Sequence, residues 1–65
     1  MMIQVNGRAH QITDNATIAD VLREMNATRH VAVELNEQVV PRIRHAETVL
    51  RPGDRIEFVT LVGGG

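Results

Sequence analysis

The chain has to fold by hydrophobic packing alone, because its 65 residues include no cysteine. A domain of this length buries only about 60 % of the surface that its unfolded chain exposes. Small domains commonly compensate with disulfides or thiolate-bound metal ions, and neither is available here. The sequence therefore predicts one small domain with a small apolar core, and the lack of cysteine fits a reducing compartment.

Charge and hydropathy argue against two classes of partner. The formal net charge is -1, and the seven cationic residues, all arginine, are scattered along the sequence. No basic stripe is present to neutralise a phosphate backbone, so we do not expect nucleic acid as a partner. The apolar segments are short and interrupted by charge, and the first residues lack the basic and apolar regions of a signal peptide. We therefore expect no membrane association and a cytoplasmic location.

The first part of the chain predicts a β-hairpin followed by a helix. Apolar and polar residues alternate around Asn6-Gly7, which is the strongest short hairpin signal, and a return strand follows over residues 9–12. Thr17 is placed to cap a helix, with Asp20 three residues further on. Apolar residues then recur at helical spacing at Ile18, Val21, Leu22 and Met25.

The second part predicts three further strands. Residues 30–35 alternate, Asn36-Glu37 turns the chain into a short strand, and Pro41 ends that strand or places it at a sheet edge. The stretch 42–50 is ambiguous, and one interpretation is a helical turn over 42–45 followed by a short extended piece. After a turn at 51–54, a last strand runs from 56 to 61. This order describes an α+β domain with one main helix across one face of a mixed sheet of four to five strands.

The last predicted strand separates an inner face from an outer one. Phe58 alternates with Glu57, whose charge should face water, so Phe58 is predicted to lie inside. The predicted core comprises Phe58, Ile56, Ile3, Val5, Val21, Leu22, Val33 and Leu50. Val59 and Leu61 share the outer face with Glu57. They form either a docking patch beside the chain end or exposed apolar residues of the kind found on any protein surface.

The chain closes on Gly63, Gly64 and Gly65. Glycine weakens both helix and strand, so we expect a domain over residues 1–62 followed by a flexible tail over 63–65. A frayed terminus is the ordinary interpretation of such an end. A tail without Cβ atoms can also thread a narrow channel and leave its terminal carbonyl open to attack. The carboxylate of Gly65 is therefore a candidate reactive group.

Several segments jointly resemble a known family. They are Val39-Val40-Pro41-Arg42, Glu47 to Leu50, the Gly53-Asp54 turn with Ile56 after it, and Val62-Gly63-Gly64-Gly65. Together they resemble the ThiS family of sulfur carrier proteins of thiamine biosynthesis, over nearly the whole chain. One departure is His45, where the family often carries an aromatic residue. The resemblance implies a ubiquitin-like β-grasp fold.

The resemblance also implies a function for the tail. An E1-like adenylyltransferase of the ThiF type would join the Gly65 carboxylate to AMP, using ATP and magnesium that this chain does not itself bind. A sulfur donor such as a cysteine desulfurase would supply sulfur for a thiocarboxylate, and a thiazole synthase of the ThiG type would receive it. Gly63 and Gly64 would thread the partner's channel. Val59, Leu61 and Val62 would contact the partner.

The remaining side chains offer no catalytic group of their own. The chain has no cysteine, serine or tyrosine, its acidic residues lack a recognisable catalytic spacing, and three dispersed histidines do not make a metal site. We therefore expect a protein co-substrate and not an enzyme. Two alternatives stay open: a sulfur carrier for molybdopterin or another pathway, and a β-grasp binding module of the TGS type. A TGS-type module has no use for a free glycine terminus.

Overall fold

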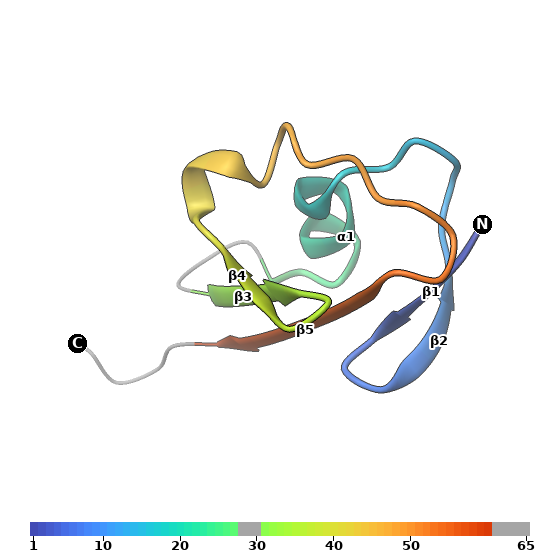
Figure 1. Ribbon diagram of the computed structural model, residues 1–65, viewed down its shortest axis with the longest axis horizontal. Coiled ribbons are helices and arrows are strands. Elements are labelled where there is room, and N and C mark those ends of the chain that lie inside the picture. Colours follow the sequence, from blue (N-terminus) through green and yellow to red (C-terminus); the bar gives the residue numbers. More distant parts are fainter. Residues whose placement is uncertain (28–30, 61–65) are drawn as a thin grey trace.

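A sheet and one α-helix form the two layers of the domain (Figure 1). The computed structural model describes residues 1–27 and 31–60. The elements in chain order are β1 (Met2–Val5), β2 (Arg8–Gln11), α1 (Ile18–Glu24), β3 (Val31–Leu35), β4 (Gln38–Val40), the 3-10 helix η1 (Arg42–Arg44) and β5 (Arg55–Thr60). The helical turn that the sequence suggested for 42–45 is therefore present. Predicted boundaries at His30 and Leu61 fall outside the described residues.

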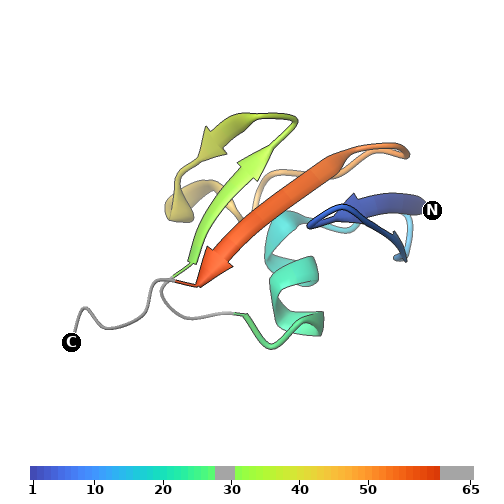
Figure 2. The ribbon, with the colours of Figure 1, turned by 90° about the horizontal axis from the view of Figure 1, so that it is seen from below.

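The sheet has five strands in the order β2-β1-β5-β3-β4. β1 and β5 are parallel, and the other neighbours are antiparallel. Figure 2 shows that α1 lies against one face of this mixed sheet and leaves the other face uncovered by a helix. The predicted α+β class is confirmed, and the arrangement is the β-grasp that the resemblance implied.

Two-residue turns connect both antiparallel hairpins. Asn6 and Gly7 have φ angles of 50° and 83°, and Asn36 and Glu37 have φ angles of 50° and 71°. Positive φ at both central positions is the requirement of a type I′ turn, which matches the twist of the strands it joins. The first turn uses the residues that favour this conformation. The second turn places a glutamate where a side chain is disfavoured.

A capping box begins α1, as the sequence predicted. The Thr17 hydroxyl accepts a hydrogen bond from the Asp20 amide (3.2 Å), and the Asp20 carboxylate accepts one from the Thr17 amide (2.9 Å). These contacts satisfy two of the amides that a helix start leaves without intrahelical partners. The hydrogen bond from the Thr17 backbone is also the main reason that the pKa of Asp20 is lowered from 3.8.

The loop after η1 satisfies the next two amides of the helix. The carbonyl of Thr48 accepts from the Ile18 amide and the carbonyl of His45 accepts from the Ala19 amide, each at 3.1 Å. A β-bridge between Thr17 and Val49 continues this contact. The start of α1 therefore depends on a segment that lies more than twenty residues further along the chain. These hydrogen bonds to a distant helix are also the reason that the sequence alone left the stretch 42–50 ambiguous.

The core lies between α1 and the inner face of the sheet. Seven of the eight predicted core residues are buried, and the exception is Phe58, which is half-buried and packs against the rim of the core. Alternation gave the correct face for Phe58, but it carries no information about how deeply that face is covered at each position. The buried apolar residues are Ile3, Val5, Ile12, Ala16, Ile18, Val21, Leu22, Ala27, Val33, Leu50 and Ile56.

We predict that Glu37→Gly raises the free energy of unfolding by roughly 0.5–1 kcal/mol. Left-handed backbone costs a side-chain-bearing residue about 1–2 kcal/mol, and glycine removes this strain at some cost in entropy. The substitution also removes the ion pair between Glu37 and Arg55 (3.8 Å), but this pair is exposed and contributes little to the free energy of unfolding. Chemical denaturation followed by circular dichroism measures the change.

Asn36→Gly is the matched control, since it occupies the same turn with the same sign of φ. The Asn36 side chain accepts a hydrogen bond from the Arg55 amide (3.0 Å) and donates one to the Asp54 carboxylate (3.1 Å). Loss of these contacts should lower the free energy of unfolding by about 1 kcal/mol. Equal effects of the two variants would show that backbone strain at Glu37 is not the governing term.

We predict a pH-dependent contribution from the capping box. Because the folded-state pKa of Asp20 lies below its ordinary value of 3.8, its carboxylate stabilises the fold at higher pH, and this stabilisation is lost as the pH falls through the folded-state pKa. The stability difference between the parent and Asp20→Asn should therefore be largest above pH 3.8 and shrink in acid. Thr17→Ala should cost about 1 kcal/mol in addition. A pH-independent difference for Asp20→Asn would contradict this account.

Candidate functional site

The outer face of the sheet, on the side away from α1, carries the most exposed apolar strand residues. Val39 on β4 is 73 % exposed and Val59 on β5 is 61 % exposed. Exposed apolar side chains that lie close together on one face are typical of surfaces that bind another protein. Ala32 on β3 lies directly opposite Val59 in the antiparallel register. We call Ala32, Val39 and Val59, together with Glu34 and Glu57, the outer patch.

The register fixes how the members of the outer patch are arranged. Val39, Glu34 and Glu57 form one row across β4, β3 and β5, because Glu34 pairs with both of the others. Ala32 and Val59 form the next row toward the end of β5. Two carboxylates therefore lie side by side on the outer face, with Val39 at one end of their row and the apolar pair Ala32 and Val59 in the next row.

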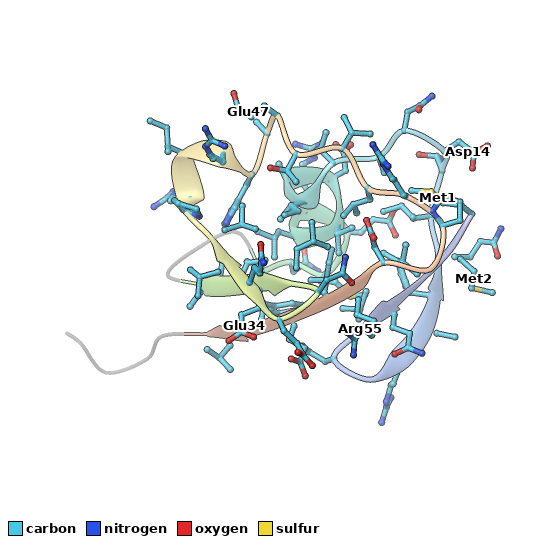
Figure 3. All side chains as sticks on the ribbon, in the orientation of Figure 1. Met1, Met2, Asp14, Glu34, Glu47 and Arg55 are labelled. Carbon is cyan, nitrogen blue, oxygen red and sulfur yellow. The ribbon has the colours of Figure 1, made fainter. Side chains whose placement is uncertain are left out.

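This surface is hollowed. A shallow depression of about 500 Å³ follows the outer patch, and its lining consists of Asn6, Ala32, Val33, Glu34, Val39, Glu57, Phe58 and Val59. Figure 3 shows Glu34 on the opposite side of the sheet from α1, while Glu47 lies beyond the helix on the other side of the domain. The outer patch thus offers an apolar, partly acidic hollow that no element of the described chain covers.

Val59 is the one predicted partner-binding residue that lies within the described part of the chain. The structure puts Val59 on the outer face, as the alternation predicted. Leu61, Val62, Gly63, Gly64 and Gly65 lie outside the described residues. β5 ends at Thr60, and the chain reaches Gly65 five residues later. The outer patch is therefore connected to Gly65 by a short covalent path.

The histidines that the structure describes have structural roles. His45 ends η1 and is buried, and its Nε2 donates a hydrogen bond to the Val40 carbonyl at 2.9 Å. His10 pairs with Glu24 at 3.1 Å between β2 and α1. His30 lies outside the described residues. His45 is thus a packing residue that holds the end of β4.

The described residues contain neither a metal-binding cluster nor a membrane-spanning helix. Among residues 1–27 and 31–60, no group of three or more His, Cys, Asp or Glu side chains could hold a metal ion. No helix in this part of the chain is both long and apolar enough to cross a membrane.

Comparison with known proteins identifies the family. The model of the ThiS family matches residues 3–65, which is nearly the whole chain and includes the three glycines. The chain belongs to the ThiS family. The crystal structure of a thiamine biosynthesis protein (ThiS) from Geobacter metallireducens superimposes on this ThiS family member with a TM-score of 0.84, covering all of both chains at 29 % identity.

Two curated relatives extend this comparison. The sulfur carrier protein ThiS of Escherichia coli is 29 % identical over the full length of both chains. A thiazole synthase of Paramagnetospirillum magneticum is 33 % identical over the whole of this ThiS family member, which spans only 20 % of that larger protein. The same sequence pattern therefore occurs both in a small separate protein and as one part of a longer one.

Sequence reasoning missed two members of the outer patch, Val39 and Ala32. The signal was present, because a two-residue turn at Asn36-Glu37 places residue 35 opposite 38 and residue 34 opposite 39. Val39 then shares a face with Glu34, and alternation along β3 puts Ala32 on the same face.

We predict that the free energy of unfolding is sensitive to substitution of Phe58 and almost insensitive to substitution of its neighbour Val59. Phe58→Ala should lower the free energy of unfolding by about 2–3 kcal/mol, less than the 3–5 kcal/mol of a fully buried phenylalanine. Val59→Ser should change it by less than about 1 kcal/mol, because that side chain faces outward. Urea denaturation of both variants measures the contrast, and a larger loss for Val59→Ser would reverse the assignment of the faces.

Proposed function

We propose that this protein is the sulfur carrier of a thiamine biosynthesis pathway and that the carboxylate of Gly65 carries the sulfur. The observation that supports the proposal most strongly is that the ThiS family match continues to Gly65 and includes the glycine tail. The full-length similarity to the sulfur carrier protein ThiS of Escherichia coli supports the same function. The protein then acts as a co-substrate of other enzymes and not as a catalyst.

The proposed chemistry begins with activation of a poor electrophile. A carboxylate oxygen of Gly65 attacks the α-phosphorus of ATP, and pyrophosphate leaves. The resulting acyl adenylate has AMP as a good leaving group. A persulfide sulfur of the donor displaces AMP and forms an acyl disulfide, and a thiol then reduces the S–S bond, which releases the thiocarboxylate and leaves the thiol oxidised in a disulfide. The three glycines favour both steps, because no Cβ atom hinders approach to the terminal carbonyl. ATP and magnesium belong to the adenylating enzyme in this scheme.

The outer patch provides a binding surface for such an enzyme. Five extended residues span at most about 18 Å, so an enzyme that binds the outer patch has the Gly65 carboxylate within reach of its own active site. Exposed apolar residues beside a hollow are typical of protein interaction surfaces. Val59, Leu61 and Val62 were predicted from the sequence to contact the partner. Val59 belongs to the outer patch, and Leu61 and Val62 would extend the same contact.

Three partners complete the proposed cycle. An E1-like adenylyltransferase of the ThiF type activates Gly65, and a sulfur donor such as a cysteine desulfurase provides the sulfur. A thiazole synthase of the ThiG type accepts it. The relative called thiazole synthase supports this last partner, because a segment similar to this chain is joined to it covalently. All of these reactions would take place in the cytoplasm.

We predict that deleting Gly65 abolishes adenylation and sulfur loading while the domain stays folded. The last carboxylate would then lie one residue short of the position at which ATP is bound. The assay is intact-protein mass spectrometry after incubation with ATP, the adenylyltransferase of the same genome and a sulfur source. The parent protein should gain the mass that accompanies replacement of one oxygen by sulfur.

Two controls define the result. Gly65 followed by one added alanine should be inactive as well, since the reactive carboxylate becomes an amide. The loaded parent protein should return to the carboxylate when thiazole synthase and its small substrates are added, and a molybdopterin synthase subunit should not discharge it. A thiocarboxylate on the protein that lacks Gly65, or discharge only by the molybdopterin enzyme, would refute the proposed function.

A further inference from the structure

We propose that Glu34 and Glu57 form the recognition element of the outer patch and that they bind an arginine or lysine side chain of the adenylating enzyme. The inference rests on the proposed function, because that function supplies the enzyme. It adds the chemistry of the contact: an apolar surface on the partner with a cationic side chain at its centre.

The two carboxylates are forced together by the sheet. Glu34 on β3 and Glu57 on β5 are directly opposite each other in the antiparallel register, and both are exposed on the outer face. Side chains at such positions have Cβ atoms about 5 Å apart. Like charges directly opposite each other destabilise a sheet, so the pair is unfavourable in the isolated domain.

Neither Glu34 nor Glu57 forms an ion pair within the described residues. The ion pairs within residues 1–27 and 31–60 use other carboxylates, namely those of Asp14, Asp20, Glu24, Glu37 and Glu47. Arg55 shares the outer face with Glu57, but its guanidinium lies 3.8 Å from Glu37 at the hairpin turn. Both carboxylates are therefore available to a cation of a partner.

The surroundings make a cationic occupant more favourable than water. Val39 lies beside Glu34 in the same row, and Ala32 and Val59 form the adjacent row. A partner that covers these apolar side chains removes water from both carboxylates, which leaves two buried charges without compensation unless the partner supplies a cation. Two carboxylates can also accept several hydrogen bonds from one guanidinium or ammonium group. An apolar or acidic partner surface would be rejected, so the pair selects among enzymes.

The proposal has a signature that separates recognition from stability. Neutralising either glutamate removes the repulsion, so Glu34→Gln and Glu57→Gln should each raise the melting temperature by about 2–5 °C. The same substitutions should weaken binding to the adenylyltransferase of the same genome by about tenfold or more. A merely structural role predicts that stability and affinity change in the same direction.

The experiment uses isothermal titration calorimetry on the full-length chain at low and at high ionic strength. Glu47→Gln is the matched control, because Glu47 is exposed and lies on the other side of the domain (Figure 3). It should bind like the parent protein. The affinity of the parent should fall as ionic strength rises, and that dependence should be reduced in Glu34→Gln and lost in the double variant Glu34→Gln/Glu57→Gln.

Each outcome decides the matter. If the parent protein binds the enzyme and is adenylated, but the glutamine variants bind with unchanged or higher affinity, the inference is wrong and the proposed function stands. If the parent protein neither binds nor is adenylated, both are wrong. A loss of affinity in the glutamine variants together with a raised melting temperature and a flatter salt dependence supports the pair as the cation-binding element.

Discussion

The parallel pairing of β1 with β5 is the contact on which the rest of the structure depends. The amides of Gln4 and Asn6 donate to the carbonyls of Asp54 and Ile56, each at 2.9 Å, and the Asn6 side chain accepts from the Phe58 amide at 2.8 Å, between residues 52 positions apart. Parallel neighbours cannot be joined by a tight turn, so the chain between them has to cross the sheet, and α1 makes that crossing. The pairing also puts β5 in the middle of the sheet. The strand that leads toward Gly65 is consequently anchored on both sides.

The sequence predicted those parts of the fold whose causes are local. Asn6-Gly7 fixes a type I′ turn, Thr17 with Asp20 fixes the start of a helix, and alternation assigns the two faces of β5. Each of these rests on residues within a few positions of one another. The stretch 42–50 could not be assigned in the same way, because its carbonyls are placed by the amides of α1 that they accept from. A segment whose hydrogen-bond partners are distant carries little local signal.

The candidate site likewise has a part with local causes, which the sequence predicted, and a part that depends on distant residues. Val59 was predictable because Glu57 beside it marks the outer face, whereas the neighbours of Val59 across the sheet depend on strand order, which no local pattern gives. The pairing of Glu34 with Glu57 is of this second kind. Its two residues are separated by 23 positions in sequence, and each alone is an ordinary surface charge. The turn at Asn36-Glu37 would have predicted the Glu34 and Val39 pair, since it sets the register of that hairpin.

The two faces of the sheet are under different physical constraints, and this difference bears on how a carrier can acquire its partners. On the inner face a change of one methylene alters the packing with α1 and costs stability. The outer face is not constrained by packing in this way, because Val39, Val59 and the two glutamates contribute little to the core. A β-grasp carrier can therefore change the charge and shape of its outer face, and so the enzyme it binds, without altering the fold that holds β5. In the function proposed here the chemistry of the tail needs only a glycyl carboxylate, and we therefore propose that the outer face determines which partner binds.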